Sequence, residues 1–379
     1  MTDTLADSRT SSRMFLEGVP LVVEDVTGRP DAERAELLAD PGFGRYFTDH
    51  MFVARYRAGE GWYDARLTAY APLQLDPSAA TLHYAQSIFE GLKAYAQPDG
   101  SVATFRPEAN AARFVRGAKR LAMPPVPEEA FLAAVDALVD ADRDWVPTGP
   151  DQTLYIRPYQ LAVEPFLGVR PAHEYLFLVI ASPAGAYFPR GVQPVSVYLS
   201  EDYIRAAPGG TGDVKCAGNY AASLLAQEQA IEAGCDQVVW LDAVEKRYVE
   251  EMGGMNLFFV LGSGEDAELV TPELTGTLLP GITRDSLITL ARERGHRVTE
   301  RRFSVDEWRE GVSDGTVTET FACGTAAVIT PVGDVKARTG NFTVADGTPG
   351  PLTMRLRESL LDIQHGRVAD TRGWLHRVA

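Results

Sequence analysis

The chain has 379 residues, of which 45% are hydrophobic and 23% are charged, proportions typical of a globular protein. Its formal net charge of −16 argues against nucleic-acid binding, because such a surface repels phosphate backbones. The three cysteines, Cys216, Cys235 and Cys323, are too few and too scattered for a disulfide framework or a cysteine-rich metal site, and they fit a reducing cytoplasm.

The first residues of the chain, MTDTLADSRTSSR, contain no apolar segment of the kind found in secretory signals. No apolar run in the sequence approaches the roughly 20 residues that span a bilayer. We therefore expect a cytoplasmic protein with no membrane partner. Residues 1–40 are polar and weakly periodic, and we interpret them as a loose N-terminal arm.

Residues 41–183 are expected to form a small α/β domain. Its helical segments show apolar residues at the 3.6-residue period of an amphipathic helix, and its strands alternate or form short apolar runs. The last run, EYLFLVIAS, is apolar enough to be buried on both faces of a sheet. In chain order we predict strands with turns in 61–77 and 82–107, helices over 107–123 and 127–145, and strands over 153–163 and 174–182.

A stretch rich in Pro and Gly, residues 184–193, is the expected linker to a large domain formed by residues 194–379. In that second part, short runs rich in β-formers alternate with helical patterns. The sequence therefore predicts an α/β (α+β) protein whose two halves divide near residue 190.

A glycine-rich stretch, GGTGDVKCAGNYA, presents one lysine, Lys215. A phosphate-binding Walker loop has Gly directly before its Lys and Ser or Thr directly after it. Here Val214 and Cys216 take those places, so a nucleotide-binding switch or a kinase is disfavoured. Glycines also free a backbone to project a lysine amine into a cavity, where it can react with the aldehyde of pyridoxal phosphate. A solvated lysine in a surface turn is the alternative.

Pyridoxal phosphate needs further partners, and the chain offers a candidate for each. Glu251, beside two glycines, could pair with the ring nitrogen, and Tyr220 could bond the phenolic oxygen. Residues 281–283 precede a predicted helix, whose first N–H groups would attract the phosphate, and Gly324 and Thr325 form a second small turn. Taken singly, a turn-capping acid, a core tyrosine, an ordinary N-cap and a tight turn explain the same residues.

Together these segments resemble the branched-chain amino-acid aminotransferases, of the fold type IV pyridoxal-phosphate enzymes. The resemblance covers about residues 45 to 365, and seven segments that are weakly specific alone follow the family's order. It implies the two-domain, D-amino-acid aminotransferase-like architecture and transamination between Leu, Ile or Val and 2-oxoglutarate. The seven segments are LHYAQSIFEGLKAY, YIRPYQLAVEPFLGV, PAGAYF, GGTGDVKCAGNYA, EEMGGMNLFFV, LLPGITRDSL and ACGTAAV.

The resemblance also implies a role for each candidate in the cofactor site. Lys215 would be the catalytic Schiff-base lysine and the general base at Cα, Glu251 would hold the pyridine nitrogen, and Tyr220 would bond the phenolic oxygen. Arg113 would bind the phosphate, with Arg116 as the alternative if the register slips. The other residues expected at the cofactor are Ile282, Thr283, Gly324 and Thr325.

Tyr155 and Arg157, in the segment YIRP, match residues of the family's substrate pocket. Arg157 is expected to hold the side-chain carboxylate of glutamate, because its planar fork can form two parallel hydrogen bonds. A salt bridge at a strand edge is the alternative for Arg157. The other residues expected at the substrate are Phe89, Tyr187, Gly254, Thr325 and Ala326.

Tyr84, Leu167 and Val169 resemble residues that reach the pocket of a neighbouring subunit, which implies a homodimer with shared active sites. Some animal members of the family carry a Cys-x-x-Cys pair after the Gly-Thr turn, where this chain has Ala327 and Thr330. We therefore expect no redox switch of that kind.

Two other activities of the same fold share the lysine and the glutamate. They are D-amino-acid aminotransferase and aminodeoxychorismate lyase. Both tend to lack the run from EGLKAY through YIRP, so the resemblance favours the branched-chain enzymes over them.

Overall fold

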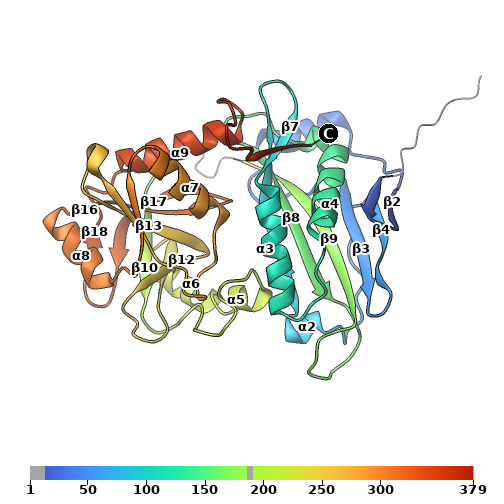
Figure 1. Cartoon of the computed structure of the whole chain (residues 1–379), viewed down its shortest axis with the longest axis horizontal. Helices are drawn as coiled ribbons and strands as arrows, with labels where there is room; N and C mark the ends of the chain where they lie inside the picture. Colours follow the sequence, from blue (N-terminus) through green and yellow to red (C-terminus); the bar gives the residue numbers. More distant parts are fainter. Residues whose placement is uncertain (1–12, 186–190, 379) are drawn as a thin grey trace, which may run out of the picture.

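Two β-sheets form the framework of the molecule (Figure 1). The computed structural model describes residues 13–185 and 191–378. The first sheet has ten strands in the order β1-β2-β4-β3-β9-β8-β6-β7-β19, with β5 paired to β8. These strands are β1 (Met14–Leu16), β2 (Val19–Val23), β3 (His50–Arg57), β4 (Gly61–Ala69), β5 (Ser87–Phe89), β6 (Leu92–Ala96), β7 (Val102–Phe105), β8 (Thr153–Ala162), β9 (Glu174–Ala184) and β19 (Leu375–Val378).

The second sheet has nine strands in the order β12-β11-β10-β17-β16-β13-β14-β15, with β18 paired to β17. Parallel and antiparallel pairs are mixed in it: β10 runs parallel to β11 and β17, whereas β13 and β16 are antiparallel. Its strands are β10 (Val195–Ser200), β11 (Gln237–Leu241), β12 (Val249–Met252), β13 (Met255–Leu261), β14 (Glu268–Thr271), β15 (Arg297–Glu300), β16 (Val317–Gly324), β17 (Val328–Lys336) and β18 (Phe342–Thr343).

Helices cover both sheets, which confirms the expected α/β fold class (Figure 1). Over the first sheet, Phe114 and Phe131 pack with Phe177 of β9, with ring centroids 5.4 to 6.2 Å apart. The helices are α1 (Asp31–Ala39), α2 (Thr81–Tyr84), α3 (Pro107–Arg120), α4 (Glu128–Ala141), α5 (Ala217–Ala221), α6 (Leu224–Glu232), α7 (Ile282–Glu293), α8 (Val305–Asp314) and α9 (Pro351–Gln364).

The central strand β13 shows why the second half of the sequence contains continuous apolar runs. Its consecutive residues Phe258 and Phe259 are fully buried in two different clusters, because successive side chains of a strand point to opposite faces. Phe258 packs in the cluster that includes Leu287 of α7 and Leu356 of α9. Phe259 stacks on Phe303 and meets Trp308 of α8 edge to face. The sheet is thus covered on both faces, as such runs predict.

Two segments differ from the sequence-based expectations. Residues 13–40, expected to belong to a loose arm, contain β1 and β2 of the first sheet and helix α1. The C-terminal strand β19, expected in the large domain, pairs with β7 of the first sheet. Apart from β19, the chain passes from the first sheet to the second between Ala184 and Val195. The domain boundaries themselves stay a prediction.

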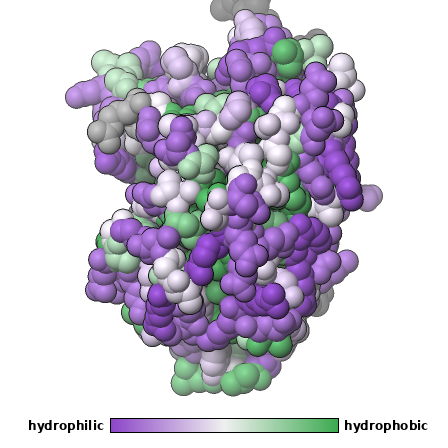
Figure 2. Space-filling model, turned by 90° about the vertical axis from the view of Figure 1, so that its left-hand side faces the viewer, coloured by the Kyte–Doolittle hydropathy of each residue, from purple (hydrophilic) through white to green (hydrophobic). Residues whose placement is uncertain are grey.

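The surface at the end of the molecule formed by the second sheet is mostly hydrophilic (Figure 2). This agrees with the large negative net charge of the chain. Among the residues that the structure describes, no helix combines the length and the apolar character needed to cross a membrane.

A buried carboxylate, Glu319 on β16, caps helix α9 from far away in the sequence. Its Oε1 accepts a hydrogen bond from the backbone N–H of Leu352 at 3.0 Å. Its Oε2 accepts from the backbone N–H and the hydroxyl of Thr353, both at 2.7 Å. Pro351 begins the helix and has no N–H that needs a partner. Glu319 therefore satisfies the first donors of α9 and complements its dipole.

We expect Glu319→Ala to lower the free energy of unfolding by about 2–3 kcal/mol, because it leaves buried donors unpaired. The measurement is urea denaturation of the cofactor-free protein, followed by circular dichroism. Glu310→Ala, at an exposed position of α8, serves as the control and should change stability by less than about 0.5 kcal/mol. Equal losses in the two variants would contradict the capping role.

Candidate active site

A cavity of about 260 Å³ lies between residues of the two sheets and the loops that connect them. From the first half, β5, α3 and β8 contribute side chains. From the second half, the glycine-rich loop, the hairpin between β12 and β13, the segment that leads into α7 and the turn between β16 and β17 contribute residues. The lining residues that the sequence singled out are Phe89, Arg113, Tyr155, Arg157, Lys215, Tyr220, Gly254, Ile282, Thr283, Gly324, Thr325 and Ala326.

The loop that carries Lys215 is held in place by hydrogen bonds on both sides. The Asn219 amide donates to the carbonyl oxygens of Thr211 at 2.7 Å and Val214 at 2.9 Å, and its Oδ1 accepts from the Thr211 hydroxyl at 2.7 Å. The carbonyl oxygen of Lys215 accepts from the backbone N–H of Phe89 at 3.0 Å. Asn219 thus closes the loop on itself, and Phe89 ties it to the first sheet.

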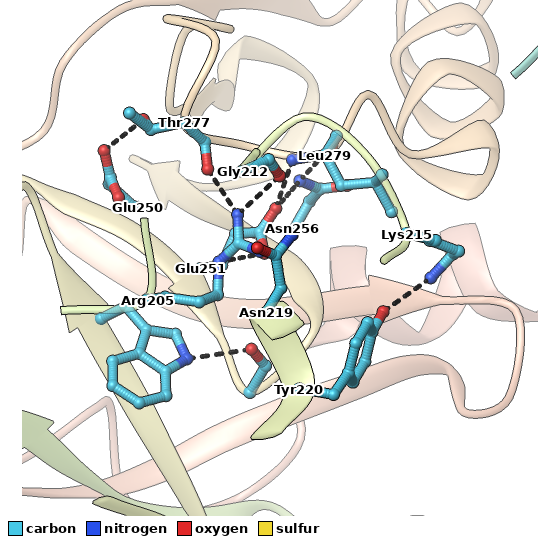
Figure 3. A network of polar contacts seen from close by, with 12 residues as sticks. Arg205, Gly212, Lys215, Asn219, Tyr220, Glu250, Glu251, Asn256, Thr277 and Leu279 are labelled. Carbon is cyan, nitrogen blue, oxygen red and sulfur yellow. Dashed lines mark hydrogen bonds and ion pairs between the residues drawn. The ribbon is translucent and has the colours of Figure 1, made fainter. Parts of the chain in front are cut away.

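The amine of Lys215 points toward the hydroxyl of Tyr220 (Figure 3). Nζ lies 3.1 Å from the Tyr220 Oη and 5.4 Å from the ring centroid of Phe89. The rings of Phe89 and Tyr220 are 4.7 Å apart. The structure therefore places a primary amine, a phenol and an aromatic wall together at one side of the cavity.

Glu251, on β12, is 1% exposed. Its Oε1 accepts from the backbone N–H of Leu279 at 2.7 Å and from the Asn256 amide at 3.4 Å (Figure 3). Its Oε2 lies 3.0 Å from Nε of Arg205, but the two atoms are not aligned as a hydrogen bond, and both stay without one among the described residues. Burial raises the pKa of Glu251, and the Arg205 charge and the Leu279 N–H oppose that rise.

Arg205 links the carboxylate to the lysine loop. Its Nη2 donates to the carbonyl oxygen of Gly212 at 3.0 Å and also to that of Thr277. Gly212 belongs to the glycine-rich stretch, and Thr277 lies two residues before Leu279 (Figure 3). The guanidinium of Arg205 therefore lies beside Glu251 and joins the segments that contain Gly212 and Thr277.

Arg113 forms a buried, two-pronged ion pair with Glu90. Nε and Nη2 of Arg113 donate to the two carboxylate oxygens at 2.7 and 2.9 Å, and the Asn110 amide donates to Oε2 at 2.8 Å. Burial opposes ionisation of Glu90, yet the Arg113 charge holds its pKa below the ordinary value. Nη1 of Arg113 donates to the carbonyl oxygen of Pro280 at 3.0 Å, beside the start of α7.

The first turn of α7 opens onto the cavity through Ile282 and Thr283. Gly281, the N-cap, has no side chain that could accept from the first N–H groups, and a Cβ there would lie 2.1 Å from Oδ1 of Asn256. An uncapped helix start presents N–H donors and a partial positive charge, which together attract an anion.

The turn formed by Gly324, Thr325 and Ala326 also lines the cavity. The Lys93 ammonium, from β6 of the first sheet, donates to the carbonyl oxygen of Ala326 at 2.8 Å. Burial lowers the pKa of Lys93 to about 8. This contact holds the turn at Ala326, in the second half of the chain, against β6 of the first sheet.

Arg157 lies in the cavity without a carboxylate partner. Its Nη2 donates to the hydroxyl of Tyr155 at 3.1 Å, and its Cζ lies 4.7 Å from the ring centroid of Phe89. Its Nε is buried and has no hydrogen-bond partner within 13–185 and 191–378. The alternative of a salt bridge is therefore not realised in the described part of the chain. Gly91 makes room for Tyr155, since a Cβ there would lie 2.1 Å from its hydroxyl oxygen.

Five of the expected residues that the structure describes do not line this cavity. One of them, Glu251, lines an adjoining pocket of about 140 Å³, and Tyr220, Gly254 and Leu279 line both. Tyr84, Leu167 and Val169 are 43%, 73% and 90% exposed, and the Tyr84 hydroxyl donates to the carbonyl oxygen of Leu167 at 2.7 Å. Arg116, the alternative to Arg113, is exposed on α3. Tyr187 falls outside the described residues.

The sequence analysis missed several residues that build the site. Glu90 directly follows Phe89, at the start of the segment EGLKAY. An acidic residue among apolar neighbours was the feature of the sequence that could have identified it. Nothing in the local sequence marked Phe43, which lines the cavity, or Arg205 and Asn256, whose roles depend on residues elsewhere in the chain. Asn219 was also missed, although its partners Thr211 and Val214 lie in the same glycine-rich stretch.

Comparison with known proteins identifies the family. The family model "Amino-transferase class IV" matches residues 87–335. The chain is 61% identical over 349 residues to the branched-chain-amino-acid aminotransferase of Mycolicibacterium smegmatis, which covers 92% of this chain and 95% of that protein. It is 58% identical over 358 residues to the branched-chain-amino-acid aminotransferase of Mycobacterium tuberculosis, covering 94% and 97%.

Solved structures agree with the sequence relatives. The Escherichia coli branched-chain amino acid aminotransferase superimposes with a TM-score of 0.72 at 30% identity, covering 87% of this chain and 99% of that one. The branched-chain amino acid aminotransferase of Thermobaculum terrenum in its PLP-form (holo-form) gives a TM-score of 0.70 at 26% identity, covering 86% and 98%. The chain therefore belongs to the class IV aminotransferases, a fold type IV family, and within it to the branched-chain-amino-acid aminotransferases.

Proposed function

We propose that this protein transfers the α-amino group of Leu, Ile or Val to 2-oxoglutarate with pyridoxal phosphate as cofactor, giving the branched 2-oxo acid and L-glutamate. The observation that carries the proposal is that Lys215 and Tyr220 line one cavity, while the buried Glu251 lines an adjoining pocket that shares Tyr220, Gly254 and Leu279 with it. Packing gives no reason for a buried carboxylate from a distant segment to lie beside this amine and phenol, whereas the cofactor needs all three.

The residues present fit pyridoxal phosphate. The clearest sign is Oε2 of Glu251, a buried carboxylate oxygen that lacks a hydrogen bond among the described residues. A protonated ring nitrogen would supply the missing donor, and the Arg205 charge opposes the rise that burial causes in the pKa of Glu251. When bound, the cofactor supplies a cationic ring that accepts electrons from the Cα of the substrate.

Lys215 has two tasks in this reaction. Its Nζ would hold the cofactor between turnovers and, when free, accept the proton from the substrate Cα. Tyr220, 3.1 Å from that nitrogen, orients the amine, and its hydroxyl would donate to the phenolic oxygen of the cofactor. The ring of Phe89, packed against that of Tyr220, forms an aromatic wall of the cavity.

The phosphate group of the cofactor would lie at the start of α7. The backbone N–H groups of Ile282 and Thr283 and the hydroxyl of Thr325 are the donors that line this part of the cavity. Arg113 adds positive charge there, but Glu90 already neutralises it. We therefore assign most of the phosphate binding to helix N–H donors, with Arg113 contributing the N–H groups that Glu90 and Pro280 leave free.

The substrate pocket has to accept both an aliphatic side chain and the carboxylate of glutamate. Phe89 and Tyr155 bury the aliphatic chain, which contributes roughly 25 cal/mol per Å². An unpaired carboxylate in the same place would be costly. Arg157, which has no acidic partner in the described part of the chain, supplies the matching charge when glutamate or 2-oxoglutarate enters.

We infer that the protein acts as a homodimer in the cytoplasm. Leu167 and Val169 are large apolar side chains that are mostly exposed, and Tyr84 fixes the loop that carries them. A partner subunit whose pocket these residues complete explains their exposure. The three cysteines are free and buried, which fits a reducing compartment.

Lys215→Ala should lower kcat/KM for L-leucine by about 10⁴-fold or more, because no other amine is placed to act at Cα. The purified wild type should show a visible absorption band that sodium borohydride bleaches, and the variant should not. Lys119→Ala, at an exposed position on α3, is the control and should keep both the band and the activity. A variant that retains turnover would contradict the role of Lys215.

Arg157→Met should raise the KM for glutamate and 2-oxoglutarate about tenfold or more, because a substrate carboxylate loses its charged partner. The KM for L-leucine should stay within about threefold, since leucine offers no charge to that position. Steady-state assays with each substrate varied separately give both values. Equal losses for leucine and glutamate would refute the assignment.

Two of the four glycines in the lysine stretch make a matched pair for testing its geometry. A Cβ at Gly212 would lie 2.2 Å from the carbonyl oxygen of Thr277, whereas a Cβ at Gly218 would meet nothing within 4 Å. Gly212→Ala must move the backbone, so we expect cofactor affinity to fall about tenfold or more. Gly218→Ala should bind the cofactor normally. Titration of the cofactor-free proteins with pyridoxal phosphate, followed by absorbance, would show the contrast, and similar affinities would contradict it.

A further inference from the structure

The C-terminal segment, residues 372–378, packs against the first half of the molecule. It contacts the last turn of helix α7 directly and the first turn through Arg106. In this segment, the indole ring of Trp374 lies against the guanidinium groups of Arg106 and Arg372. The Cζ atom of each arginine is 5.1 Å from the ring centroid. Nε of Arg372 donates to the carboxylate of Glu293, in the last turn of α7, at 3.0 Å. The carbonyl oxygen of Trp374 accepts from the backbone N–H of Arg106 at 2.7 Å. β19, which follows, pairs with β7 (Figure 1).

Arg106 reaches the other end of the same helix. Its Nη1 donates to the hydroxyl of Ser286 at 2.7 Å, and its Nη2 forms an ion pair with Asp285 at 2.7 Å. The Ser286 hydroxyl, fully buried, in turn donates to the carbonyl oxygen of Ile282 at 2.8 Å. A chain of two hydrogen bonds therefore runs from the guanidinium of Arg106 to Ile282, the first residue of α7, which lines the cavity.

The conformation of Arg106 indicates that this position is held by its contacts. Its backbone has φ 50° and ψ 45°, in the left-handed region that residues other than glycine seldom adopt. Its side chain is only 19% exposed. Both observations are explained if Trp374 and α7 together fix the residue between them.

The charges around the first turn of α7 give Arg106 a second effect. Asp285 stabilises the helix start by its negative charge, but the same charge repels an anion bound at that end. The ion pair with Arg106 offsets this repulsion without placing a side chain in the cavity, because Arg106 is not among the residues that line it.

We propose that Arg106 is a positioning residue for the phosphate of pyridoxal phosphate. It fixes the first turn of α7 through Ser286, and it screens the charge of Asp285. Trp374 holds it in place, so the C-terminal segment takes part in cofactor binding without contacting the cofactor. The inference rests on the proposed function, in which the N–H groups of α7 receive the phosphate.

The test compares two ligands that differ only in the phosphate. Cofactor-free wild type and variants are titrated with pyridoxal phosphate and with pyridoxal, and dissociation constants come from the visible absorbance. Arg106→Met should weaken pyridoxal phosphate about tenfold and leave pyridoxal within about twofold of wild type. Ser286→Ala should show the same selectivity with a smaller loss, about threefold.

Arg309→Met is the matched control, because Arg309 also lies over an aromatic ring, that of Phe342, and its guanidinium, on α8, donates to the hydroxyl of Thr339. It should change neither dissociation constant. Equal weakening of both ligands by Arg106→Met and Ser286→Ala, or no weakening by either, would overturn the proposal. If Arg106→Met fails to fold, the dissociation constants of pyridoxal phosphate and pyridoxal are compared in Arg106→Lys and Ser286→Ala instead. Wild type that binds neither ligand would instead contradict the proposed function.

Discussion

Burying the carboxylate of Glu251 costs free energy, and the surrounding contacts offset that cost only in part. One oxygen is satisfied by the Leu279 N–H and the Asn256 amide, and the other faces the charge of Arg205 without a hydrogen bond in the described part of the chain. Arg205 in turn holds the backbone of Gly212, in the lysine loop. The positions of Glu251, the lysine loop and the Lys215 amine thus depend on one another. The cationic ring of pyridoxal phosphate would complete the balance of charge around Glu251.

The same principle explains how two sheets produce a single site. Three contacts join the halves around the cavity: Phe89 binds the backbone of Lys215, Lys93 binds the turn at Ala326, and Arg113 binds the carbonyl oxygen of Pro280. These are directed hydrogen bonds, so they fix the distance between the halves more narrowly than apolar packing alone would. The site is therefore formed at the junction, and neither half contains it.

The sequence predicted the groups that react with the cofactor better than the groups that hold them. Lys215 and Tyr220 lie five residues apart on one loop, so local spacing and the order of motifs were enough. Arg205 and Asn256 were missed because their roles come from partners that only the folded chain brings near. The first strands were interpreted as a loose arm for a similar reason: β2 pairs with β4, about forty residues away, and β1 and β2, of three and five residues, are too short to show a periodicity of their own.

The position of β19 has a consequence for the order in which the chain can acquire its structure. The first sheet contains most of the early part of the chain, but its edge at β7 receives a partner only from residues 375–378. During synthesis that edge remains open until residues 375–378 have left the ribosome, because the N-terminal half emerges first. An unpaired edge strand is a site where two nascent chains can associate wrongly. The short length of β7, four residues, limits the surface that is exposed during this delay.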